Sequence, residues 1–95
     1  MQLNSQAFLY RSNGEVIPVS PLNMKSFTLK ELQGFVTGHI EILSLIDGRL
    51  MILHEEGKLK SQIKNELATS LASDVLMDGD YIVGDVLVTP YALVD

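Results

Sequence analysis

The sequence predicts a single α+β domain spanning residues 1–95, in which two helices lie on one face of a mainly antiparallel sheet. Segments with strand-like and helix-like patterns follow one another in the order ββαββαβ, and an Asn-Gly or Asp-Gly pair separates the strands of each ββ unit. Such pairs favour the tight turns of β-hairpins. A chain of 95 residues, 46% of them apolar, supplies one hydrophobic core and not two.

The first hairpin is predicted around Asn13-Gly14, between apolar segments at residues 7–10 and 16–19. A two-residue turn needs positive φ at both positions, and these residue types tolerate it. Pro18 has no N–H to donate to a neighbouring strand, so we expect its strand to lie at a sheet edge.

The first helix is predicted to begin at Leu29. Thr28 followed three residues later by Glu31 is a capping box, in which each side chain bonds to the other residue's backbone N–H. Gly38 is expected to take the left-handed conformation that ends the helix. Gly34 inside the helix is unfavourable, and we expect close packing of another backbone to compensate.

The second hairpin is predicted from residues 39–46, Asp47-Gly48 and residues 49–54. Four apolar residues in succession, at 50–53, place apolar side chains on both sides of the second strand. This pattern indicates a central strand covered on both faces.

The remaining elements are a second helix and a final strand. Apolar residues recur at i+4 spacing, namely Leu59, Ile63, Leu67 and Leu71. This spacing allows a helix beginning near Ser61, whereas Asn65 as an N-cap would begin a shorter one. Residues 81–88 are rich in β-formers, and Gly84-Asp85 within them predicts a bulge or tight bend.

Several blocks in this order resemble one family, the domain-of-unknown-function family numbered 3846. The blocks are Leu32 to Glu41, His54 to Lys60, Asn65 with Ala68-Thr69, and Tyr81 to Val88. The likeness covers roughly residues 28–89. It implies a shared fold and an origin in phages, plasmids or other bacterial mobile elements, but no activity and no catalytic residue. The family's connector also favours the shorter second helix, which begins at Asn65.

Composition excludes several classes of protein. Twelve acidic residues against seven basic ones give a net charge of −5, which argues against nucleic acid as a partner because phosphate binding needs clustered cations. The absence of cysteine excludes disulfides and thiolate chemistry. Apolar runs are far shorter than the roughly 20 residues of a membrane helix. No secretory signal begins the chain, so we expect no membrane partner and a cytoplasmic location.

Catalytic and metal-binding patterns are incomplete. His54-Glu55-Glu56 is the most enzyme-like cluster, yet strand alternation places His54 and Glu55 on opposite faces. Asp78-Gly79-Asp80 lacks the downstream glutamate of a calcium loop. We therefore expect no catalytic residue, metal or cofactor, and we do not expect an enzyme.

Charge is distributed unevenly along the chain. Residues 65–95 hold six acidic residues and no basic one, whereas Lys58, Lys60 and Lys64 form a basic cluster just before them. The candidate ligand-binding residues are His54, Lys58, Lys60, Lys64, Asn65 and Asp85.

Two functions from different classes fit these observations. The first is a small accessory or regulatory module that binds a protein partner. The alternative is a protein that binds a small anionic, nucleotide-like ligand through the loop at residues 54–65. Self-association as a homodimer is also expected if Pro18 and residues 91–94 lie at sheet edges.

Overall fold

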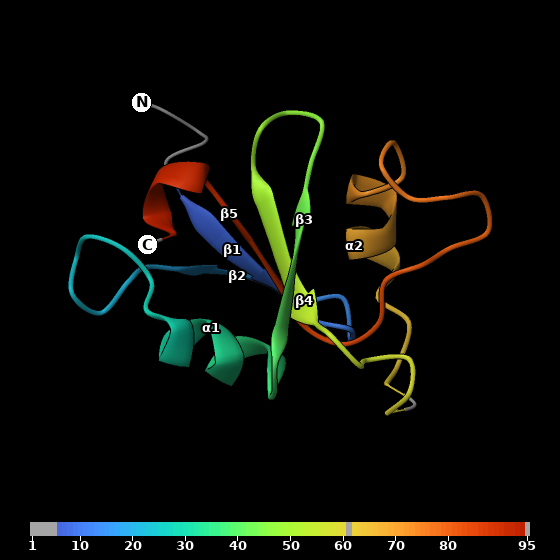
Figure 1. Ribbon diagram of the computed structural model, residues 1–95, viewed down its shortest axis with the longest axis horizontal. Helices are drawn as coiled ribbons and strands as arrows, with labels where there is room; N and C mark the ends of the chain where they lie inside the picture. The colour runs from blue at the N-terminus through green and yellow to red at the C-terminus, as the bar shows by residue number, and fades with distance from the viewer. Residues whose placement is uncertain (1–5, 61, 95) are drawn as a thin grey trace.

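A five-stranded antiparallel sheet in the order β2-β1-β5-β4-β3 forms the centre of the molecule (Figure 1). The computed structural model describes residues 6–60 and 62–94. The elements are β1 (Ala7–Tyr10), β2 (Val16–Val19), α1 (Leu29–Val36), β3 (Ile40–Ser44), β4 (Leu50–His54), α2 (Glu66–Leu71), β5 (Val86–Thr89) and a short 3-10 helix (Tyr91–Leu93). This arrangement confirms the predicted order ββαββαβ and the antiparallel sheet.

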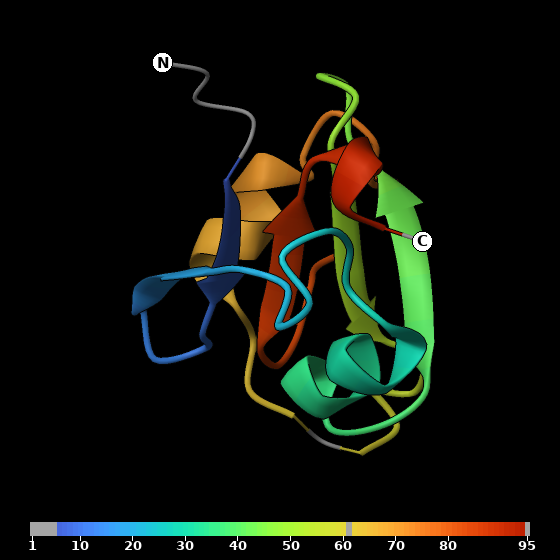
Figure 2. The ribbon, with the colours of Figure 1, turned by 90° about the vertical axis from the view of Figure 1, so that its left-hand side faces the viewer.

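The two helices cover opposite faces of the sheet, so their predicted placement on one face is wrong (Figures 1 and 2). Leu50 and Ile52 of β4 pack in one cluster with residues of α1. Met51, which points the other way in the same strand, packs with Ala68 and Ala72 at α2. The run of apolar residues in β4 therefore has the expected physical cause, because each face of this central strand has its own cover. The expectation of one core is wrong, since a separate core cluster lies on each face of the sheet.

Both hairpins use three-residue loops and not the predicted two-residue turns. The Arg11 N–H bonds to the Glu15 carbonyl at 2.8 Å, and the Leu45 N–H bonds to the Arg49 carbonyl at 2.8 Å. In each loop the final glycine alone takes a positive φ, 96° at Gly14 and 88° at Gly48. This is the turn in which a left-handed residue forms a bulge at the start of the second strand.

The start of α1 agrees with prediction and its end does not. Thr28 and Glu31 form the complete capping box. The left-handed residue at the end of the helix is Thr37, with φ 63°, and not Gly38. Within the described residues, nothing lies within 4 Å of the place where a Cβ on Gly34 would stand, so no neighbouring backbone there compensates for the glycine.

Asn65 begins α2, as predicted, and also ties three segments together. Its side-chain oxygen accepts the Ala68 N–H at 3.0 Å, while its amide nitrogen donates to the carbonyls of Tyr10 and Gly84. Gly84 has φ 74° and forms the expected bend, after which β5 begins at Val86. A buried amide that bonds to β1, the bend and its own helix positions α2 over the sheet.

The sheet has different edges at its two ends. β2 is one edge, which confirms the expectation for Pro18, and β3 is the other. Residues 91–93 form a 3-10 helix and Val94 makes an isolated parallel bridge to Phe27, so the C-terminal segment is not an edge strand.

Candidate functional site

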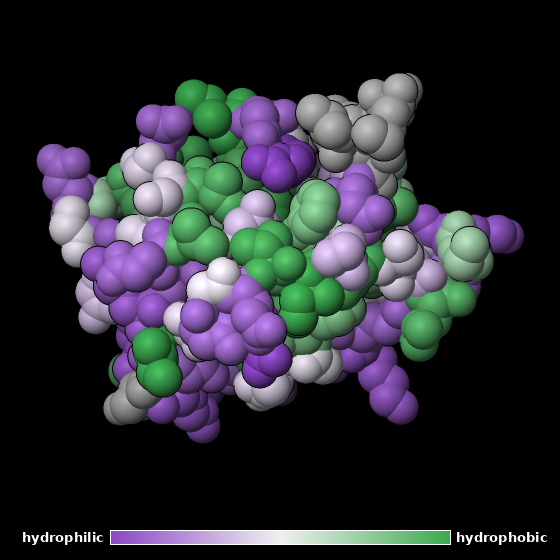
Figure 3. Space-filling view, turned by 180° about the vertical axis from the view of Figure 1, so that it is seen from behind, coloured by the Kyte–Doolittle hydropathy of each residue, from purple (hydrophilic) through white to green (hydrophobic). Residues whose placement is uncertain are grey.

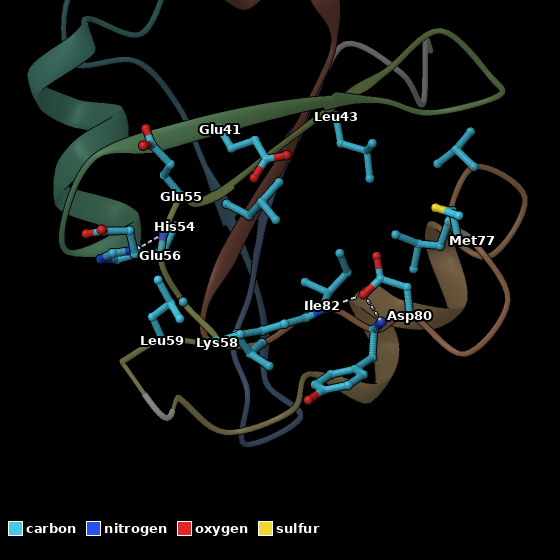
Figure 4. A pocket seen from close by; sticks show the side chains of 16 residues that line it. Glu41, Leu43, His54, Glu55, Glu56, Lys58, Leu59, Met77, Asp80 and Ile82 are labelled. Atoms are coloured by element: carbon cyan, nitrogen blue, oxygen red, sulfur yellow. Dashed lines mark hydrogen bonds and ion pairs between the residues drawn. The ribbon is translucent and has the colours of Figure 1, made fainter.

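A groove with an apolar floor and acidic borders lies between the β3–β4 hairpin and the segment that leads from α2 to β5 (Figure 4). We call it the acidic groove. Its volume is ≈ 290 Å³. Its lining includes Glu41, Leu43, Leu53, Glu55, Glu56, Lys58, Leu59, Val75, Met77, Asp80 and Tyr81.

The floor exists because α2 covers only part of its face of the sheet. With six residues, the helix is about 9 Å long, and its buried alanines pack on β4 and β5. Leu43 on β3 and Leu53 on β4 are consequently only partly buried. Met77 and Leu59, with 83% and 82% of their surfaces exposed, stand on opposite sides of the groove.

Carboxylates border this floor. Glu41 on β3 and Asp80 on the opposite segment direct their side chains into the groove, and Glu55 and Glu56 lie near its end (Figure 4). The Lys58 ammonium donates a hydrogen bond to Asp80. This bond, together with one from the Tyr81 N–H, holds the pKa of Asp80 below its usual value. Within residues 6–60 and 62–94, no cation lies at ion-pair distance from the three glutamates.

Exposed apolar area alone does not distinguish the groove. Apolar side chains also reach the surface across the centre of the face seen in Figure 3, between hydrophilic residues. What sets the acidic groove apart is that apolar side chains and carboxylates of one sign line the same hollow.

Two of the predicted lysines are placed by contacts within the chain. The Lys58 ammonium lies 4.4 Å from the centre of the Tyr81 ring, and that of Lys64 lies 5.8 Å from it. Lys64 is also 3.6 Å from a Glu66 carboxylate oxygen. Each lysine therefore combines an ion pair with a cation–π contact, which reduces its availability to an external anion.

Lys60 lies apart from that pair. It lines two neighbouring hollows, one shared with His54 and Gln62 and the other with Gln62 and Asp85. The loop thus brings Lys60 near two of the other candidate residues, but it directs Lys58 and Lys64 towards Tyr81. None of these three hollows, which are lined by described residues, contains all six candidates.

His54 and Asp85 make contacts that hold the fold together. The Nδ1 atom of His54 accepts the Glu56 N–H at 2.9 Å, and its ring packs directly on Gly38. Asp85 accepts the Ser12 N–H at 2.9 Å and lies 3.4 Å from the Nε of Arg11. Buried Asn65 has the capping and bridging role described above.

The acidic C-terminal third is partly neutralised by basic residues that precede it. Its Glu66, Asp80 and Asp85 pair with Lys64, Lys58 and Arg11 respectively. Asp95, which contributes to the predicted charge excess, lies outside the described residues. Two of these ion pairs, Arg11–Asp85 and Lys58–Asp80, therefore join segments that are far apart in sequence. The charges of this region also interact with water at the surface.

Two further observations concern metals and membranes. Across the described residues, no three histidine or acidic side chains are grouped so that they could hold a metal ion. Within the same part of the chain, every helix is too short or too polar to cross a membrane.

The fold and the groove define a small α+β domain with a five-stranded antiparallel sheet and a helix on each face. The chain belongs to the family described as Domain of unknown function (DUF3846), which matches residues 9–92. The match confirms the resemblance and extends it beyond residues 28–89. No curated protein and no solved structure shows significant similarity to the chain.

The groove residues Glu41, Leu43 and Met77 are absent from the predicted site. The available signal was the β3 sequence, in which Glu41 and Leu43 are two residues apart and so share a face. Nothing in the local pattern indicates that residues 75–81 fold back opposite that face, because this segment has no regular secondary structure to predict.

Proposed function

We propose that this domain is a protein-interaction module, and that the acidic groove binds a basic segment of a partner protein that carries apolar side chains. The observation that supports this most is the combination of a partly uncovered floor at Leu43 and Leu53 with the carboxylates of Glu41, Glu55 and Glu56. The apolar floor supplies binding free energy. The carboxylates select the sign of the partner's charge and speed association.

The exposed borders of the groove favour a peptide segment over a small molecule. Pockets for drug-sized ligands hold about 300–1,000 Å³ and enclose most of the ligand, and this groove, with ≈ 290 Å³, lies at the lower end of that range. Its exposed apolar borders, at Met77 and Leu59, would remain in contact with water around a small ligand. A longer segment would cover them while placing one or two side chains on the floor.

A titration with synthetic peptides tests this function. The probe is a short peptide that alternates lysine with valine, followed by NMR of the ¹⁵N-labelled protein, and the control peptide alternates glutamate with valine. We expect saturable shifts at Leu43, Leu53 and Met77 with the basic peptide only. Equal binding of both peptides, or shifts confined to the surface around Lys60, would overturn the proposal.

A matched pair of variants separates binding in the groove from general attraction to an acidic protein. Glu41→Gln removes a carboxylate inside the groove, whereas Glu15→Gln removes one at the first hairpin loop. Both changes alter the net charge equally. We expect weaker binding of the basic peptide to the first variant and unchanged binding to the second.

The anionic-ligand alternative depends on the loop lysines, and the geometry favours it less. Lys58 and Lys64 each lie against a carboxylate and a ring, which leaves Lys60 between the two neighbouring hollows. A thermal-shift series with nucleotides tests this alternative, because a ligand that binds the folded state raises the melting temperature. Stabilisation that Lys60→Ala abolishes would favour it over the groove.

The resemblance to the family also leads us to propose a setting for the module, as a cytoplasmic accessory protein encoded on a bacterial mobile element. The genes on either side of its own test this origin. Neighbouring phage or plasmid genes would support it, and a consistent position among housekeeping genes would contradict it.

A further inference from the structure

The outer edge of β3 presents unpaired backbone groups in a regular pattern. The Glu55 N–H bonds to the His39 carbonyl at 2.9 Å, and the Leu45 N–H bonds to the Arg49 carbonyl at 2.8 Å. Since hydrogen-bonded and non-bonded residues alternate along an antiparallel strand, positions 39, 41, 43 and 45 bond to β4. The backbone groups of Ile40, Ile42 and Ser44 therefore point away from the sheet.

The opposite edge of the sheet is blocked and this one is not. On β2, the hydrogen bond between Arg11 and Glu15 shows which residues bond to β1 and which face outward. Pro18 is at an outward-facing position, where another residue would offer an N–H to a new strand. Proline at such a position is a standard protection against pairing with another strand. β3 contains neither proline nor lysine, and within the described chain β4 is its only neighbouring strand.

We infer that two copies of this chain pair through β3, antiparallel across a two-fold axis at Ile42, to form one continuous ten-stranded sheet. Ile42, 48% exposed in the single chain, would then lie directly opposite the partner's Ile42 and exchange two backbone hydrogen bonds with it. Apolar cross-strand pairs of this kind stabilise a sheet.

The same register agrees with the charges of the strand. It places Glu41 opposite the partner's Leu43, so no two carboxylates face each other across the junction. A register centred on Glu41 would place two glutamates directly opposite, which is unfavourable. An interface between two identical subunits requires a self-complementary sequence, and β3 meets this requirement when it pairs with a reversed copy of itself.

The pairing would also change the acidic groove. Glu41 and Leu43 both face the groove, so the partner's Glu41 would add a carboxylate beside the Leu43 side chain. The two grooves would become one acidic surface that crosses the two-fold axis. Dimer formation itself does not depend on the groove having the proposed function, because it uses the backbone edge and Ile42.

Cysteine cross-linking tests the register directly, since the chain contains no cysteine of its own. In a hydrogen-bonded antiparallel pair the Cα atoms are about 5.5 Å apart, but the Cβ atoms are farther apart than the about 3.5–4.5 Å of a disulfide, so a short bis-maleimide is the suitable cross-linker. We expect Ile42→Cys to form a covalent dimer with this reagent. Leu22→Cys, at a position 86% exposed on the loop before α1, serves as the control. Equal cross-linking of both variants would overturn the proposal.

A second pair of variants asks whether the edge itself is required. Ile42→Pro removes an outward-facing N–H, so the bonds of β3 to β4 are kept and the single chain still folds. Ile42→Val keeps both the N–H and the apolar cross-strand contact, and it serves as the control. Sedimentation equilibrium should show a dimer for the wild type and Ile42→Val, and a monomer for Ile42→Pro with an unchanged circular dichroism spectrum. A folded Ile42→Pro that still forms dimers, or a monomeric wild type at NMR concentrations, would refute β3 pairing.

The two proposals fail separately. A monomeric wild type that still binds the lysine–valine peptide in the groove would remove the dimer and leave the proposed function. A dimeric wild type that binds neither peptide would do the reverse.

Discussion

Lys58 donates a hydrogen bond to the carboxylate of Asp80, and this ion pair joins the loop after β4 to the segment before β5. The two residues are far apart in sequence and lie on opposite sides of the acidic groove. The pair neutralises one groove carboxylate and leaves Glu41, Glu55 and Glu56 to give the groove its charge.

Lys58→Met should raise the pKa of Asp80 towards its ordinary value, because the hydrogen bond from Lys58 is the largest cause of its lowered pKa. The folded-state pKa is lowered, so the pair's contribution to stability is present at neutral pH and lost as the pH falls through that pKa. A ¹³C NMR titration of the carboxyl groups measures the change. Lys64→Met, which leaves the pair intact, should not alter the Asp80 pKa, and an equal shift in both variants would contradict this assignment.

Gly38→Ala should destabilise the domain by about 1–3 kcal/mol through overpacking. A Cβ at this position would overlap the Nε2 atom of His54, whose ring is held by the Glu56 N–H. Gly34→Ala is the matched control, because open space surrounds that helical glycine. It should increase stability by up to about 1 kcal/mol. Urea unfolding of both variants tests the pair, and equal effects of the two substitutions would count against the close His54 packing.

Asn65→Ala should destabilise the domain by about 2–4 kcal/mol, because it removes a cap and leaves two carbonyls without their donor. Those carbonyls belong to Tyr10 and Gly84. Thr28→Ala removes only an exposed cap and should cost about 1 kcal/mol. Thermal unfolding of the two variants makes the comparison. A loss in Asn65→Ala no larger than in Thr28→Ala would show that the bridging bonds contribute little.

Local features of the fold could be predicted from short stretches of sequence. The capping box of Thr28 and Glu31, the N-cap at Asn65 and the bend at Gly84 each depend on contacts within a few residues. Their hydrogen bonds or backbone angles follow from residue type. The close packing of Gly38 could not be predicted in this way, because the glycine packs against His54, which belongs to another element.

The placement of the helices depended on the apolar pattern of β4, which determines how other elements pack against that strand. Apolar residues on both sides of β4 predicted cover on both faces, while the α+β order favoured two helices on the same face. These two expectations conflict, and the packing of α1 with Ile52 and of α2 with Met51 resolves the conflict in favour of the strand pattern. The burial pattern of a central strand was the more informative signal here.

The candidate site was predictable only in part. The lysines were found as a sequence cluster, but Tyr81, Asp80 and Glu66 determine where two of them point. Those partners follow the cluster in sequence and meet it through the packing of irregular segments. Charge patterning along the chain therefore predicts where charged residues cluster, but it does not show which of those charges the fold neutralises.

A reversal of charge specificity tests the interaction function most directly. The wild type and the double variant Glu41→Lys/Glu55→Lys are each titrated with the lysine–valine and the glutamate–valine peptides by isothermal calorimetry. The wild type should bind the basic peptide, and the double variant should lose that binding and bind the acidic peptide instead, because the apolar floor is unchanged. An unchanged preference in the double variant would contradict recognition by the acidic groove.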